Sequence, residues 1–417
     1  MALPTRELVI LGAGTAGTMM AWTLPRTLPD GWRVTVIDPD PQHIYQPGLL
    51  FIPFGWYAPG EIVKTRRSTL PPGVRWIEQG VDRVDSDAKT VVLKNGEALS
   101  WDLLIVSTGC RTVPEALEGL TTEGVWNQSA FDFYTLEGAV GLRDKLRSFK
   151  GGRIVVNPAE MPIKCPVAPL EMAFLLEAWA TEQGIRDDVD ISFVTPLDGA
   201  FTKPVAAATL GNLLAQRGIN VVADFAASEV QGGPEGGSLK GWDGRSVDFD
   251  LLVSTPPHRG SSLFDNSGLA DELAYVRVDK RTLQSVVHDD VFALGDATDC
   301  PTSKAGSVAH FQAESLLENL ERHIGGRAVQ PTFDGHANCF VETGHDKAIL
   351  LDFNYDTQPL PGDFPLAGAG PFKLLGESRM NHWGKLAFRW VYWNLLLPGK
   401  GMPIDARMLM AGKRGAA

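Results

Sequence analysis

The sequence predicts an α/β protein with two Rossmann-like dinucleotide-binding domains and a C-terminal region that associates with a membrane surface. Three observations support this prediction. A glycine-rich loop lies between an apolar segment and a helix near the N-terminus, a strand sequence occurs twice about 150 residues apart, and the C-terminal tail is basic and aromatic. The 417 residues suffice for two to three domains.

The glycine-rich loop predicts the first dinucleotide-binding domain. In order along the chain stand an apolar strand at 8–11, the loop Gly12-Ala13-Gly14-Thr15-Ala16-Gly17, the start of a helix, a strand at 33–37, and Asp38. Gly12 permits the tight turn, Gly14 lets the backbone approach a pyrophosphate, and Gly17 lets helix and strand pack closely. The helix N-terminus offers free N–H groups to the anion, and Asp38 is placed to accept from a ribose hydroxyl.

The repeated strand sequence predicts a second domain of the same kind. The two copies are Trp101–Thr108 and Phe249–Thr255, and between them strands and helices alternate at 153–157, 168–183, 189–195, 204–216 and 219–223. Such alternation is typical of a second Rossmann-like unit inserted in the first. We expect a discontinuous first domain at 1–110 and 246–330, a second at 111–245, and a C-terminal region at 331–417.

Composition excludes several classes of protein. Net charge is −12, which disfavours nucleic acid as a partner. The four cysteines, at 110, 165, 300 and 339, are too few for a disulfide scaffold and lack zinc-binding spacing. No apolar run reaches the roughly 18 residues of a spanning helix. We also expect no signal peptide, because residues 7–11 lead directly into the glycine loop, and this favours the cytoplasmic side.

The C-terminal tail differs from the rest of the chain in its charge. Residues 371–417 carry a net charge of +6, against −18 for the rest of the chain. A helix is predicted from Asn381 to Pro398, apolar around most of its circumference, with Lys385 and Arg389 one turn apart. It is too short to span a bilayer, so we expect it to lie among lipid headgroups as part of a peripheral, monotopic membrane protein, with the membrane face left open. A buried helix that closes a dimer is the alternative, so a homo-oligomer also stays open.

Two further motifs complete a resemblance to a superfamily. They are Ser107-Thr108-Gly109 and Ala293-Leu294-Gly295-Asp296-Ala297. Together with the glycine loop and Asp38, they resemble the flavin-binding signatures of the two-dinucleotide-domain flavoproteins, which include disulfide reductases and type II NADH dehydrogenases. The resemblance covers residue 7 to about residue 325. It implies FAD as the cofactor, with Asp296 near the ribitol chain.

The second domain lacks a glycine fingerprint of its own. Strand 153–157 is followed by Pro158-Ala159-Glu160-Met161-Pro162, and no glycine lies between Gly152 and Gly184. Proline cannot donate a backbone N–H to a pyrophosphate, and Glu160 would repel it. We therefore predict that the nicotinamide cofactor site is lost.

The loop that replaces this fingerprint resembles sulfide:quinone oxidoreductases. It reads Lys164-Cys165-Pro166-Val167-Ala168-Pro169-Leu170-Glu171, and Cys339-Phe340 follows about 174 residues later. The resemblance implies a Cys165/Cys339 redox pair beside the flavin, Glu171 as a proton acceptor, and Lys304, within Pro301–Gly306, near the flavin ring. It further implies Phe340 and Phe372 beside a quinone. Segment 43–48 has no cysteine for covalent attachment, so FAD is expected to be bound without a covalent link.

Two cysteines suit sulfide chemistry. Hydrosulfide can attack a disulfide, leaving a persulfide on one cysteine and a thiolate on the other. We expect Cys165 to favour the thiolate, because it precedes a helix and adjoins Lys164. The predicted activity is oxidation of sulfide with transfer of two electrons through FAD to quinone and release of sulfur or polysulfide.

Other functions remain open from sequence alone. The second enzymatic alternative is the flavin subunit of a sulfide dehydrogenase, which differs in passing its electrons to a cytochrome, and the third is a type II NADH:quinone dehydrogenase. A flavin redox sensor without turnover is the non-enzymatic alternative. No role is assigned to Cys110, Cys300 or the histidines His310, His336, His345 and His382.

Overall fold

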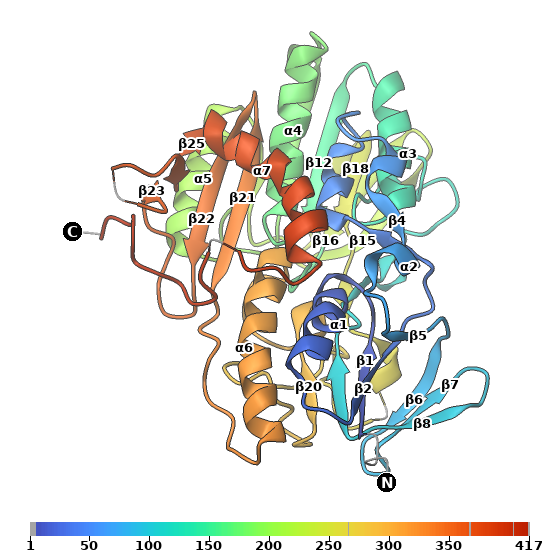
Figure 1. Cartoon of the computed structure of the whole chain (residues 1–417). Helices are drawn as coiled ribbons and strands as arrows, with labels where there is room; N and C mark the ends of the chain where they lie inside the picture. Colours follow the sequence, from blue (N-terminus) through green and yellow to red (C-terminus); the bar gives the residue numbers. More distant parts are fainter. Residues whose placement is uncertain (1–5, 266, 367, 403, 416–417) are drawn as a thin grey trace.

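The computed structural model describes every residue except 1–5, 266, 367, 403 and 416–417. Figure 1 shows one parallel sheet in the lower half of the molecule, a second in the upper half, and a C-terminal sheet at the upper left. The α/β class and the two Rossmann-like sheets are confirmed.

The first parallel sheet holds the predicted glycine loop at one strand end. Its order is β20 (Val291–Ala293), β9 (Leu103–Val106), β1 (Arg6–Leu11), β2 (Trp32–Ile37) and β5 (Arg75–Ile77), and all neighbours are parallel. Every β1 residue after Arg6 is buried, as expected of a strand covered on both faces. Helices α1 (Thr15–Thr27) and α6 (Gly306–Ile324) pack against each other beside this sheet.

The second parallel sheet repeats this arrangement. Its order is β11 (Ala130–Phe131), β18 (Leu251–Thr255), β12 (Gly152–Pro158), β13 (Val189–Val194) and β14 (Asn220–Val222), with helices α3 (Leu136–Ser148), α4 (Ala168–Glu182) and α5 (Pro204–Gln216). The two similar strand sequences occupy equivalent places, because β9 pairs with β1 and β18 pairs with β12.

This pairing moves one expected domain boundary. We placed the return to the first domain at residue 246, but β17 (Ser246–Phe249) and β18 belong to the second domain. The chain crosses back near β19 (His258–Arg259), which pairs with β10 (Arg111–Thr112). Sequence similarity identified a strand but not the sheet it joins, which only the pairing partner decides.

Short elements complete the two domains. Strands β3 (Gln42–Ile44) and β4 (Val63–Thr65) form an antiparallel pair. One three-stranded antiparallel sheet consists of β6 (Val81–Asp85), β7 (Thr90–Leu93) and β8 (Ala98–Ser100), and another of β15 (Ala227–Gly233), β16 (Gly236–Gly241) and β17. The short helices are α2 (Arg66–Thr69), η1 (Gln46–Phe51), η2 (Pro59–Glu61), η3 (Pro114–Ala116), η4 (Arg186–Asp188), η5 (Ser262–Phe264) and η6 (Gly295–Ala297).

The C-terminal region forms a sheet crossed by a helix. Strands β21 (Ala337–Gly344), β22 (Lys347–Phe353), β24 (Phe372–Leu374) and β23 (Gly362–Phe364) follow in that order, and β25 (Glu377–Ser378) pairs with β22. Helix α7 (Arg379–Val391) contacts β21 and β22 and continues into a π-helical turn, η7 (Tyr392–Leu396). Ser378 caps α7 by accepting from the Asn381 N–H at 3.0 Å.

The side chains of helix α7 that face solvent and those that face the protein are not the ones that we expected of an interfacial helix. Met380, Trp383 and Trp390 are about half exposed or more, at 47%, 63% and 62%. Both expected surface cations instead find partners in the protein: Lys385 reaches Glu171 in the interior, and Arg389 pairs with Glu61 at 3.0 Å. No helix in the described part of the chain is long and apolar enough to cross a membrane.

Candidate active site

The glycine loop leaves room for a ligand at one position and is tightly packed at the others. At Gly12, φ is +91°, and a Cβ would lie 2.6 Å from the carbonyl oxygen of Ser107. At Gly17, a Cβ would lie 1.9 Å from the Gly12 oxygen. A Cβ at Gly14 would meet no atom within 4 Å. Gly12 and Gly17 are therefore required by packing, whereas Gly14 opens a space in which a pyrophosphate fits.

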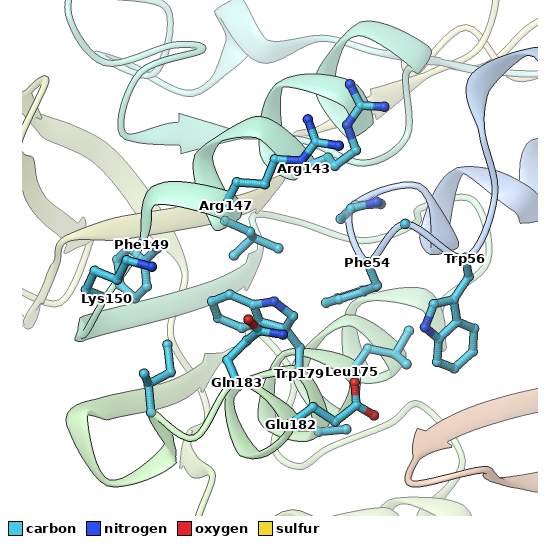
Figure 2. A pocket seen from close by; sticks show the side chains of 15 residues that line it. Phe54, Trp56, Arg143, Arg147, Phe149, Lys150, Leu175, Trp179, Glu182 and Gln183 are labelled. Atoms are coloured by element: carbon cyan, nitrogen blue, oxygen red, sulfur yellow. The ribbon is translucent and has the colours of Figure 1, made fainter.

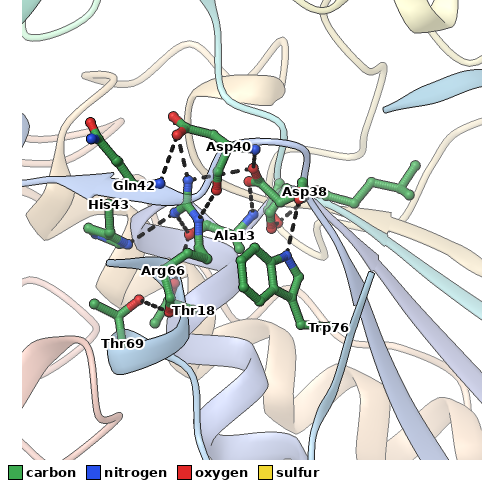
Figure 3. A network of polar contacts seen from close by, with 12 residues as sticks. Ala13, Thr18, Asp38, Asp40, Gln42, His43, Arg66, Thr69 and Trp76 are labelled. Carbon is green, nitrogen blue, oxygen red and sulfur yellow. Dashed lines mark hydrogen bonds and ion pairs between the residues drawn. The ribbon is translucent and has the colours of Figure 1, made fainter. Parts of the chain in front are cut away.

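Asp38 lies at the centre of a polar network beside this loop (Figure 3). Its Oδ2 accepts from the Ala13 N–H at 2.6 Å, and Arg66 Nη2 lies 3.5 Å from its Oδ1. Arg66 is buried and also donates to the Ala13 carbonyl and, at 3.2 Å, to His43 Nδ1. Burial, and next the Arg66 charge, lower the pKa of His43 to about 3. Sequence analysis missed Arg66, a buried cation next to a loop suited to pyrophosphate.

The other flavin motifs also present free groups. Thr108 Oγ1 is buried without a hydrogen-bond partner among the described residues, and a Cβ at Gly109 would meet no atom within 4 Å. Gly295, with φ at +70°, donates its N–H to Gln312 Oε1 at 2.6 Å. Burial raises the pKa of Asp296. The unpaired Thr108 hydroxyl and the free space at Gly14 and Gly109 fit the binding of FAD, because a bound cofactor would fill that space and satisfy the hydroxyl.

Two loop residues expected near the cofactor have protein neighbours. The Thr15 hydroxyl lies 2.8 Å from the hydroxyl of Tyr392, which follows α7. Ala16 packs beside Gly295, where an added Cβ would lie 3.3 Å from the alanine methyl. The C-terminal region is thereby joined to the glycine loop.

Cys165 lies in the loop between β12 and α4, in a strained backbone conformation. Its φ is +46°, in the left-handed region that non-glycine residues rarely adopt. Its N–H donates to the Lys304 carbonyl at 2.7 Å, and its own carbonyl accepts from the Ala168 N–H at 2.8 Å. The Lys304 ammonium donates to the carbonyls of Asp296, at 3.1 Å, and Thr298, at 2.6 Å. The Lys304 segment therefore connects the Cys165 loop to the third flavin motif.

Cys339 comes to the same place from β21. Ser307, at the start of α6, donates its hydroxyl to the carbonyl of Asn338, the residue before Cys339, at 2.7 Å. Burial raises the pKa of Cys339 to about 12. Burial, then the charges of Glu171 and Cys339, raise the pKa of Cys165 well above its ordinary value. The two thiols are thus electrostatic neighbours, and both are free in this structure.

The expected thiolate at Cys165 is wrong for this environment. The cost of burying a charge exceeds the help from the helix end. Lys164 does not direct its ammonium at the sulfur, but lies 3.3 Å from Gln46 Oε1. Cys110 is equally protonated, since burial, and then the Asp296 charge, raise its pKa to about 12.

Glu171 is buried beneath the cysteines in an ion pair. Its Oε1 accepts from the Glu342 N–H at 2.6 Å and from the ammonium of Lys385. Lys385 also donates to the Phe340 carbonyl at 2.9 Å. Burial lowers the pKa of Lys385, but the Glu171 carboxylate beside it contributes most to a net rise. Lys385, which sequence analysis placed on a helix at the lipid surface, is therefore part of the site.

Two aromatic rings stand next to this pair. The centroids of Phe340 and Phe372 are 5.5 Å apart, at 64° between planes. At Gly384 of α7, a Cβ would lie 2.7 Å from Phe372 Cε1 and 2.9 Å from Phe340 Cζ. Glycine therefore allows α7 to lie against both rings and brings Lys385 beside them.

A separate cavity of about 320 Å³ lies between α3, α4 and residues 53–56. Phe54 and Trp179 line its middle, and Arg143 and Arg147 face Glu182 across it (Figure 2). Its lining includes no cysteine and none of the flavin motifs. The chemistry of the site therefore lies in the cysteine cluster and not in this cavity.

Comparison with known proteins identifies the family. The family model described as pyridine nucleotide-disulphide oxidoreductase matches residues 6–157. The mitochondrial sulfide:quinone oxidoreductases of Dictyostelium discoideum and Mus musculus are each 27% identical to this chain, over 94% of it and 86% of their own lengths. Over nearly its whole length, this chain is similar to the sulfide:quinone oxidoreductases.

The structure of a member of this family has the same fold. The sulfide:quinone oxidoreductase of Aquifex aeolicus matches with a TM-score of 0.76 at 21% identity, over 94% of this chain and 92% of that one. The family is one of FAD-dependent oxidoreductases, so the predicted family, fold class and enzyme class are confirmed.

Proposed function

We propose that this chain oxidises sulfide at a Cys165/Cys339 pair, passes two electrons through FAD to a quinone, and releases sulfur or polysulfide. One observation carries the proposal. Two half-buried cysteines from different parts of the fold border the Glu171–Lys385 ion pair: Cys165 precedes the helix that carries Glu171, and Cys339 precedes Phe340, whose carbonyl accepts from Lys385.

The sulfur chemistry requires the pair to alternate between disulfide and thiols. Hydrosulfide adds to one sulfur of the disulfide, the S–S bond breaks, and the other sulfur leaves as thiolate. Burial raises the pKa of both thiols, so a thiolate is costly here and favours onward transfer of its electron pair. Glu171, whose pKa burial raises, is the proposed acceptor for the proton of incoming sulfide.

The chain offers a non-covalent FAD site. When bound, FAD would accept an electron pair on the sulfur side and give it up on the quinone side. The loop at 12–17 and the Asp38–Arg66 pair would hold its phosphates and ribose, and the motifs at 108–109 and 295–296 its remaining length. Lys304, buried beside Asp296, supplies a cation there.

In this proposal, the C-terminal region binds both the quinone and the membrane surface. The Phe340–Phe372 pair forms aromatic walls, and the ammonium of Lys385 stands at their edge. The exposed Met380, Trp383 and Trp390 on the outer side of α7 suit a headgroup region, where a peripheral protein would receive a lipid-soluble acceptor.

The second domain argues against NADH as electron donor. Strand β12 of this domain leads into a proline-rich loop whose Glu160 pairs with Arg259. A carboxylate at this strand end opposes a pyrophosphate. NADH-dependent bleaching of the flavin would favour the type II dehydrogenase instead, and a requirement for a cytochrome would favour the sulfide dehydrogenase.

Cysteine replacement tests the proposal. Cys165→Ser and Cys339→Ser are each expected to retain the flavin absorbance but to lose its bleaching by sulfide. Cys300→Ser is the matched control, because Cys300 is also buried and protonated but lies beside Thr298 and Tyr355. Full bleaching of both variants by sulfide would exclude the assigned pair.

A further inference from the structure

Proton balance sets a requirement on the site, given the proposed function. Hydrosulfide, one proton and a quinone give sulfur and a quinol, and two hydrosulfides, one proton and a quinone give hydrogen disulfide anion and a quinol. In both cases two electrons pass from sulfur to quinone, and one proton per turnover must enter from solvent. The Lys385 side chain, which donates to the Phe340 carbonyl, is only 12% exposed, so a proton that replaces one lost from it needs a route through neighbouring protein groups.

His382, on the buried side of α7, has the geometry of a proton shuttle. Its Nδ1 lies 3.0 Å from both carboxylate oxygens of Glu342, and its Nε2 lies 3.9 Å from Asp346 Oδ1. The Asp346 side chain is 72% exposed, whereas that of His382 is 6% exposed. An imidazole with one nitrogen toward solvent and the other on a buried carboxylate can take up a proton at one side and release it at the other.

Glu342 connects His382 to the active site. Its side chain is fully buried, and its backbone N–H donates to Glu171 Oε1 at 2.6 Å. The same Glu171 oxygen also accepts from the Lys385 ammonium, so Glu342 borders the ion pair directly. Neither Glu342 nor His382 has a part in the sulfur chemistry described above.

We propose that His382 and Glu342 are the proton entry of the quinone half-reaction. His382 accepts a proton at Nε2 on the Asp346 side and passes the Nδ1 proton to Glu342. Glu342 then returns a proton to Lys385 after that ammonium has given one to a quinone oxygen. Each turnover thereby moves one proton inward, as the balance requires.

The electrostatic surroundings keep His382 ready to carry a proton. The hydrogen bond that its ring donates to the Glu342 carboxylate raises the pKa of His382, and the charge of Asp346 adds to this effect. Two aromatic rings also contact the imidazole, namely Trp56, at 5.7 Å between centroids, and Trp383, the next residue of α7, and neither titrates. Glu342 and Asp346 are therefore the charges that set its protonation.

The test isolates the quinone half-reaction from sulfide. The FAD-loaded protein is reduced with one equivalent of dithionite under anaerobic conditions and mixed rapidly with decylubiquinone at several pH values. In His382→Gln and Glu342→Gln we expect flavin reoxidation to slow by about tenfold or more and to lose the wild-type decline as pH rises through the His382 pKa. His345→Gln is the control, because His345 pairs with the buried Glu177 at 2.9 Å outside this path.

A readout independent of turnover accompanies the kinetics. The NMR signal of the His382 ring should titrate above the ordinary histidine pKa in the wild-type protein, and Glu342→Gln should lower that midpoint. Unchanged rates and pH profiles in both variants would overturn the proton entry while leaving the proposed function intact. Failure of the wild-type protein to reduce decylubiquinone would overturn both, and failure of sulfide alone to reduce the flavin would affect only the sulfur half.

Discussion

The Glu171–Lys385 ion pair offers the sharpest test of how the site is held together. It joins α4 of the second domain to α7 of the C-terminal region, and its side chains are 1% and 12% exposed. Removing one partner of a buried pair leaves an uncompensated charge and costs about 3–5 kcal/mol. Glu171→Gln keeps an acceptor for the Glu342 N–H, so its cost is attributable to the lost charge.

The double variant separates the pair from its parts. Lys385→Met leaves the Glu171 carboxylate with only the Glu342 N–H, and should also lower the free energy of unfolding by about 3–5 kcal/mol. Combined with Glu171→Gln, it removes both charges, and the double variant should lose much less than the sum, with a coupling of about 3 kcal/mol.

Urea unfolding of the FAD-loaded protein, followed by tryptophan fluorescence, measures these free energies. The matched control is the exposed pair between Arg389 of the same helix and Glu61, whose replacement by Met and Gln should show no measurable coupling. Additive losses at 171 and 385, or single variants as stable as wild type, would refute the ion pair as the link between the two regions.

Three further predictions address the cofactor loop, pH and the membrane. Gly14→Val should leave the apoprotein stable but weaken FAD binding at least tenfold by titration, whereas Gly17→Ala, with a Cβ 1.9 Å from a carbonyl oxygen, should lower the melting temperature of the apoprotein itself. Because Glu342 raises the folded-state pKa of His382, the stabilisation from this histidine is complete below about pH 6.5 and is lost as pH rises through the folded value; His382→Gln should therefore lower the melting temperature more at pH 6 than at pH 9. Trp383→Glu with Trp390→Glu should abolish co-sedimentation with phospholipid vesicles at unchanged stability, and undiminished sedimentation would remove α7 from the membrane surface.

Much of the flavin site could be predicted from sequence because its requirements are local. Close backbone approach at Gly12 and Gly17 needs the absence of a side chain, and the strand, loop and helix that surround them are adjacent in the chain. The loss of the second glycine fingerprint is equally local. Helices α4 and α5 were placed within one residue for the same reason, since their apolar patterns and prolines mark their ends.

The rest depended on which face of an element meets which neighbour. The aromatic pattern of α7 predicted a helix but could not show that Lys385 points inward, because that depends on Glu171, 214 residues away, being buried opposite it. Strand β18 joined the second sheet only because β12 lies beside it. The protonated state of Cys165 likewise follows from burial, which its sequence neighbours do not reveal.

The sequence by itself determined the resemblance to sulfide:quinone oxidoreductases, the two Rossmann-like folds and the glycines that the first loop requires, because these depend on contacts within a few residues. Only the tertiary structure decided that a lysine of the C-terminal helix pairs with a buried carboxylate in the helix after Cys165, and that His382 lies between the buried Glu342 and the exposed Asp346. Burial and charge pairing are properties of surfaces brought together by folding, and a linear pattern does not contain them.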